Sequence, residues 1–90
     1  MRLNEDNAYQ MTGLNLTLLA FGRAVRSRRV AIGVSQEQLA LEAGLDRTYV
    51  GGVERGERNL SFNNLVKLAR ALAISPSKLL ELAEGIDHEI

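Results

Sequence analysis

The residues from Ser35 to Gly56, SQEQLALEAGLDRTYVGGVERG, constrain the fold more than any other part of the chain. Ser35 is followed three residues later by Gln38, the spacing of a capping box, which predicts the start of a helix. Gly44 predicts its end, because glycine adopts the left-handed conformation after a helix without a steric penalty. Asp46 is the expected N-cap of a second helix. The segment therefore predicts two short helices joined by a tight turn.

Two helices joined by a turn of three or four residues containing glycine form a helix-turn-helix motif. The first turn of the second helix carries Asp46, Arg47, Thr48 and Tyr49. In such motifs these amino-terminal residues contact base edges in the major groove of DNA. The pattern therefore predicts a partner, double-stranded DNA, and the residues that read it.

The words GVSQEQLA, AGLDRTYV and VERGERN resemble the Cro/repressor-type, or XRE, family of helix-turn-helix proteins. Within that family, LDRTYVGGVERGERNLSF is most similar to the controller proteins of restriction–modification systems. The similarity extends over most of the chain, from Phe21 to Leu82. It implies a lambda-repressor-like DNA-binding domain in a transcriptional regulator that binds palindromic operators as a homodimer.

The flanking segments predict three further helices. One begins near Asn15 to Leu18 and extends to about Ile32, another begins after Ser61 and extends to about Ala73, and the last begins at Ser75-Pro76 and ends at Gly85. Proline is harmless at the first helical position, where its missing N–H has no intrahelical partner. We expect an all-α fold, a compact five-helix bundle over residues 14–90, and a flexible arm over residues 1–13.

Charge is unevenly distributed although the net charge is zero. Nine Lys or Arg and five Asp or Glu lie between Arg23 and Arg70, whereas only acids follow Lys78. Because binding responds to the local field, such a chain can meet DNA with one basic face. The basic segment includes Arg23, Arg26 and Arg28, which predict either a solvated helix face or phosphate contacts.

Base reading is assigned first to Arg47, whose guanidinium matches the O6 and N7 acceptors of guanine. Thr48 can bond either kind of base edge. Tyr49 has two interpretations, contact with a phosphate or pyrimidine and packing against the preceding helix. Asp46 is a cap first and a base contact only where a cytosine amino group is near.

Phosphate contacts are expected around the second helix of the motif. Gln36 opens the preceding helix, whose free N–H groups and dipole favour an anion, and the resembling family uses the matching glutamine on the DNA backbone. Arg55 lies in the basic loop that follows. The resemblance implies backbone or groove-edge contacts for Arg58, Asn59 and Asn64.

Two further features have structural interpretations. The resemblance implies an ion pair between Arg29 and Glu54, which would make Arg29 tolerable on an apolar helix stripe. Gly51 and Gly52 are unfavourable inside a helix; they either have no role or let the helix backbone approach the sugar–phosphate wall.

The helices after Ser61 carry more leucine than one small core needs. This excess predicts either a self-complementary dimer patch or a core that uses all of these side chains within one chain. Its expected members are Leu72, Ile74, Leu79, Leu82 and Ile86.

An enzyme is disfavoured because the chain has one histidine, His88, and no cysteine. We expect no catalytic residue, metal, cofactor, small-molecule ligand or membrane span, and a cytoplasmic protein. An antitoxin or phage-type repressor with the same fold, acting through a protein partner, is the alternative function. An activator would also need a surface for RNA polymerase, for which Glu37 and Glu42 are candidates.

Overall fold

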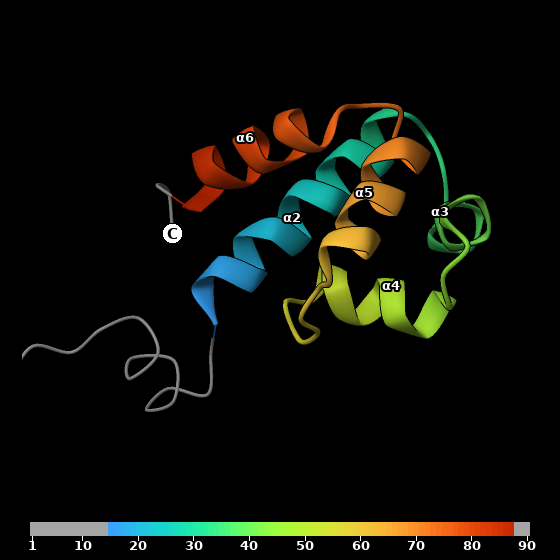
Figure 1. The fold of residues 1–90 in the computed structure, drawn as a ribbon, viewed down its shortest axis with the longest axis horizontal. Helices are drawn as coiled ribbons and strands as arrows, with labels where there is room; N and C mark the ends of the chain where they lie inside the picture. Colours follow the sequence, from blue (N-terminus) through green and yellow to red (C-terminus); the bar gives the residue numbers. More distant parts are fainter. Residues whose placement is uncertain (1–14, 88–90) are drawn as a thin grey trace, which may run out of the picture.

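The computed structural model describes residues 15–87, which form five helices and no strand (Figure 1). The helices are α2 (Leu16–Ala31), α3 (Gln36–Ala43), α4 (Arg47–Glu54), α5 (Phe62–Ala71) and α6 (Pro76–Asp87). The predicted all-α class and the predicted number of helices are confirmed. The arm expected over residues 1–13 lies outside the described residues.

The helix starts follow the predicted caps. The Ser35 hydroxyl accepts a hydrogen bond from the Gln38 amide at 3.1 Å, and the Gln38 side chain accepts one from the Ser35 amide at 2.8 Å, completing the capping box. Asp46 and Ser61 cap α4 and α5, and the side-chain oxygen of each accepts a hydrogen bond from a backbone amide in the first turn. Short side chains therefore fix where the helices of the motif begin.

The helix ends are predicted less well. Gly44 is left-handed, with φ of 70°, and ends α3 as expected. Gly85 does not end α6, which continues to Asp87. The glycine costs only about 1 kcal/mol within a helix, and continuation lets Ile86 pack against the core.

The core forms around α2. In Figure 1, α6 lies antiparallel along α2, with α5 beside them and α3 and α4 at the other side of the bundle. The largest fully buried side chains come from all five helices: Val25, Leu39, Val50, Val53, Leu68, Leu72 and Leu79. None of the helices between Leu16 and Asp87 combines the length and apolar composition needed to cross a bilayer.

Arg28 has a structural role that the sequence did not indicate. Its Nε donates to the Leu72 carbonyl oxygen at 2.9 Å, and its Nη2 lies 3.4 Å from the Ala73 carbonyl oxygen. These oxygens belong to the end of α5, where carbonyl groups lack helical partners. The prediction that Arg28 lies on a solvated or DNA-facing side is therefore wrong, whereas Arg23 and Arg26 are exposed as expected.

Two glycines let α2 and the carboxyl end of α4 approach each other closely. A Cβ added to Gly22 would lie 2.2 Å from the Val53 carbonyl oxygen and 2.6 Å from that of Glu54. Beyond α4, Gly56 has φ of 75°, and an added Cβ would lie 2.7 Å from the Leu19 Cα. Since backbone atoms occupy both places, neither clash can be relieved by moving a side chain.

This packing predicts a strong effect of one methyl group. Gly22→Ala should lower the free energy of unfolding by about 3 kcal/mol, because it must push the two helices apart. Gly85→Ala is the matched control: nothing lies within 4 Å of its added Cβ, so it should raise stability by about 1 kcal/mol through helix propensity. Thermal and urea unfolding measure both, and equal stability of the two variants would contradict the close helix approach.

Candidate nucleic-acid interface

The amino end of α4 is an accessible part of the predicted motif. Arg47 and Thr48 are both exposed. The Arg47 guanidinium has no hydrogen-bond or ion-pair partner among residues 15–87. Asp46 is occupied in part, because its Oδ1 accepts a hydrogen bond from the Thr48 amide at 2.9 Å. Arg47 and Thr48 are therefore the side chains that this end offers to a partner.

The opposite side of α4 is buried through Val50 and Val53, which are 0% and 1% exposed. At its last residue, Glu54 is only 7% exposed. The helix therefore runs from a free amino end beside α3 to a carboxyl end enclosed against α2 (Figure 1).

The Glu54 carboxylate is the junction of three helices. Arg29 of α2 donates from Nε to Oε2 at 2.7 Å and from Nη2 to Oε1 at 3.0 Å, so the predicted ion pair is present and bidentate. Gln36 of α3 donates from Nε2 to Oε1 at 3.0 Å. Arg29 also donates from Nη1 to the Val34 carbonyl oxygen at 3.0 Å, which fixes the entry to α3.

The charge of Arg29 is stabilised by this arrangement. The hydrogen bonds to Glu54 raise the pKa of the guanidinium above its ordinary value, burial opposes the rise, and the Coulomb attraction of Glu54 adds to it. Because the folded state raises this pKa, protonation of the guanidinium stabilises the fold fully at any pH below the ordinary arginine pKa. The stabilisation is lost as the pH rises through the raised pKa. Arg29 therefore stays charged at neutral pH.

Tyr49 connects α4 with the turn and helix that follow. Its hydroxyl donates to the Asn59 carbonyl oxygen at 3.0 Å and accepts from the Asn64 Nδ2 at 3.2 Å. The Arg58 guanidinium carbon lies over its ring, 5.5 Å from the centroid. The hydroxyl is thus directed toward the turn and α5, while Tyr49 itself is partly buried and packs against the core.

The predicted phosphate-contacting residues are brought together by these contacts. Arg58, Asn59 and Asn64 surround Tyr49. Arg55 and Gln36 approach the same part of α4, since Arg55 Nη1 and Gln36 Oε1 lie 3.1 and 3.6 Å from where a Gly51 Cβ would be. A basic and amide-rich surface therefore borders the exposed end of α4.

Comparisons with known proteins agree with this geometry. A family model described as "Helix-turn-helix" matches residues 25–79. The chain belongs to the XRE-type helix-turn-helix family. It is a DNA-binding regulator of the restriction–modification controller type, a class without enzymatic function.

Two control proteins illustrate the relationship. The chain is 46% identical to control protein C.BamHI of Bacillus amyloliquefaciens over 68 residues, 74% of this chain and 83% of that protein. It is 51% identical to control protein C.SmaI of Serratia marcescens over 65 residues, 72% of this chain and 76% of that protein.

A solved structure extends the likeness to the fold. The restriction–modification controller protein C.AhdI from Aeromonas hydrophila is 58% identical, and the match covers 69% of this chain and 94% of that one with a TM-score of 0.68. The helix order and the motif described above are therefore those of an experimentally known controller fold.

Other side chains of the same chain cover the two adjacent glycines of α4. Both Gly51 and Gly52 are buried. Arg55 lies over the first, and the stem of Arg58 lies 2.4 Å from where a Gly52 Cβ would be. In this structure arginine side chains therefore cover both glycines, and the approach of the helix backbone to a sugar–phosphate wall stays a prediction.

Part of the predicted dimer patch is also corrected. Leu72 and Leu79 are 0% exposed, so they belong to the core of one chain and offer no area to a partner. Ile74, Leu82 and Ile86 are only partly buried and pack against that core.

Four large apolar side chains that the sequence analysis did not single out are far more exposed: Val30 at 61%, Leu41 at 82%, Phe62 at 74% and Leu80 at 48%. Phe62 and Leu80 line one hollow together. Leu80 could have been noticed, because it lies off the helical stripe through Leu79, Ala83 and Ile86.

Removing the charge of Glu54 should weaken the whole domain. Glu54→Gln leaves the Arg29 guanidinium buried without a counter-ion, and losing one partner of such a pair costs about 3–5 kcal/mol. Denaturant unfolding measures the loss. The exposed pair of Arg55 and Glu57, 3.1 Å apart with both side chains more than half exposed, gives the control: Glu57→Gln should cost less than about 1 kcal/mol. Similar losses in the two variants would contradict the role assigned to Glu54.

Proposed function

We propose that the protein binds a palindromic DNA operator as a homodimer and regulates transcription in the cytoplasm, as a restriction–modification controller. The observation that carries this proposal is the free amino end of α4. Arg47 and Thr48 are exposed there, and their side chains have no competing partner within residues 15–87, while the other end of the helix is held by Glu54. A rigid helix with a free polar tip is what major-groove reading requires.

Base contacts are assigned within this tip. Arg47 donates to guanine O6 and N7, and Thr48 bonds a base edge or contacts a thymine methyl group. Asp46 keeps its capping bond and reaches a base only at a cytosine amino group. Tyr49, whose hydroxyl is already used twice, holds neighbouring groups in place and at most touches the edge of the groove.

Phosphate contacts are assigned to both sides of α4. The first amides of α3, at Gln36 and Glu37, have no helical acceptor and form an anion site with the dipole of that helix. On the other side lie the cationic and amide side chains around Tyr49. These are Arg55, Arg58, Asn59 and Asn64.

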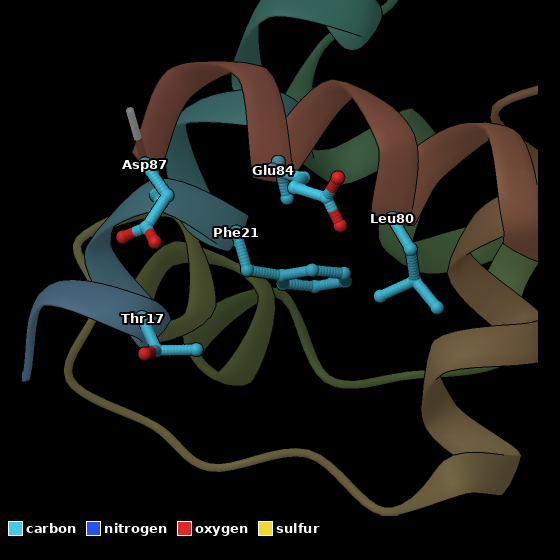
Figure 2. Close-up of a pocket in the computed structure, with 7 residues that line it drawn as sticks. Thr17, Phe21, Leu80, Glu84 and Asp87 are labelled. Atoms are coloured by element: carbon cyan, nitrogen blue, oxygen red, sulfur yellow. The ribbon is translucent and has the colours of Figure 1, made fainter. Parts of the chain in front are cut away.

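The dimer interface is assigned to the apolar surface around Phe62 and Leu80. A hollow of about 350 Å³ lies between α2 and α6, where Phe21 forms its floor between Thr17, Leu80, Glu84 and Asp87 (Figure 2). A second hollow of about 340 Å³ adjoins it and reaches Phe62.

A second copy of the chain is the occupant that suits these hollows. The surface combines the exposed phenyl ring of Phe62 with two apolar hollows, so a two-fold axis could place each Phe62 in a hollow of the partner copy. Phe62 also follows directly on the turn that carries Arg58 and Asn59. A palindromic operator requires that this two-fold axis place both α4 tips on one side, toward half-sites about 34–36 Å apart.

An activator would add a contact with RNA polymerase. Glu37 and Glu42 are exposed on α3, and they are our candidates for that surface.

Arg47→Ala tests the assignment of base reading. Duplexes selected from a random library by the unmodified chain provide the site, and base substitutions in it provide the competitors. The variant should lose about 1–3 kcal/mol of discrimination at one base pair in each half-site and keep its non-specific binding. Lys78→Ala, at an exposed position on α6, should keep the full preference. Unchanged sequence preference in Arg47→Ala would refute the assignment.

Phe62→Glu tests the interface. Sedimentation should give a dimer for the unmodified chain and a monomer for this variant, because a carboxylate would be buried without a partner. Leu41→Glu is the matched control, since Leu41 is 82% exposed on α3 outside the interface, and it should remain a dimer. If Leu41→Glu dissociates the dimer and Phe62→Glu does not, the assignment of the interface to Phe62 and Leu80 is wrong.

A further inference from the structure

Gly52 lies on the same face of α4 as Tyr49, three residues earlier. A Cβ added to Gly52 would lie 2.4 Å from Arg58 Cγ, 3.4 Å from Cδ and 3.7 Å from Cβ. The aliphatic stem of Arg58 therefore rests directly on the bare backbone of α4. From there its guanidinium reaches over the Tyr49 ring, 5.5 Å from the centroid.

Gly51 differs from its neighbour in one decisive respect. The atom nearest to an added Cβ at Gly51 is Arg55 Nη1, at 3.1 Å. This is the far end of a long and exposed side chain, which can shift at little cost. At Gly52 the nearest atoms belong to the root of Arg58, so an added methyl group forces that whole side chain onto another path.

We propose that Gly52 is a positioning residue for DNA binding: its missing side chain holds Arg58 against α4 and Tyr49, where the guanidinium meets a phosphate beside the reading end. The inference rests on the proposed function for its DNA part. The proposal explains why a glycine that is unfavourable in a helix is present. An arginine already stacked on an aromatic ring loses less conformational entropy when it binds an anion. The rival explanation is that DNA itself approaches the bare backbone.

A double-mutant cycle separates these explanations. The unmodified chain, Gly52→Ala, Arg58→Ala and the double variant are titrated with a duplex selected from a random library, over a range of KCl concentrations. Gly52→Ala should bind about a hundredfold more weakly as a dimer, because about tenfold is lost with one charge-assisted hydrogen bond in each half-site. The slope of log K against log salt should become less steep by about 1.8, because one phosphate contact is lost in each half-site. The double variant should bind no more weakly than Arg58→Ala.

Gly85→Ala, at an exposed position on α6 with nothing within 4 Å of the added Cβ, is the control and should bind as the unmodified chain does. The proposal is overturned if Gly52→Ala binds normally. It is also overturned if this substitution weakens the Arg58→Ala background as much as the unmodified one, since the glycine would then contact DNA directly.

Thermal unfolding of the same four proteins tests the contact without DNA. In the Arg58→Ala background, Gly52→Ala should raise the melting temperature through helix propensity; with Arg58 present, the clash should remove that gain. Equal shifts in the two backgrounds would overturn the packing of Arg58 on Gly52. Failure of the unmodified chain to prefer its selected duplex over a scrambled one would instead count against the proposed function.

Discussion

The buried pair of Arg29 and Glu54 is the interaction on which the rest of the arrangement depends. One carboxylate receives two bonds from α2 and one from α3, while it belongs to α4. Apolar contacts alone are non-directional and would allow neighbouring orientations of an eight-residue helix. The bidentate guanidinium adds a defined distance and angle. The direction in which α4 points is thus set at its enclosed end.

The two ends of α4 therefore have different tasks. Close packing of Gly22 against the last carbonyl groups leaves the carboxyl end no room to move. At the amino end, within residues 15–87, Asp46 makes a capping bond to the Thr48 amide, and the Arg47 and Thr48 side chains are exposed beside it. Because the enclosed end holds the helix in place, the open end can use its polar groups on a ligand. This division is consistent with a single binding surface on a chain whose net charge is zero.

Much of this could be predicted from the sequence because the decisive signals are local. Ser35 with Gln38, Asp46 and Ser61 satisfy amides within three residues of themselves, so their roles need no knowledge of the fold. The ion pair was implied by resemblance, together with a lone arginine on an apolar stripe. The protein family was indicated by the short segments GVSQEQLA, AGLDRTYV and VERGERN.

The misses concern contacts made over long sequence distances. Arg28 was placed among solvated residues because its acceptors, at the end of α5, lie more than forty residues away. The leucine pattern shows which face of a helix is apolar but not how far neighbouring helices cover it, so Leu72 and Leu79 were confused with interface residues. Gly85 has the chemistry of a stop signal, yet the packing of Ile86 prolongs the helix.

One nuclear magnetic resonance titration tests the central claim most directly. The labelled chain is titrated with its selected duplex while backbone amides and the Arg29 Nε–H group are followed. The account predicts the largest changes at the starts of α3 and α4 and around Asn59. It also predicts a slowly exchanging Arg29 Nε–H signal that keeps its position, because that group bonds Glu54 and not DNA. Large changes along α6, or an Arg29 signal that shifts on binding, would contradict it.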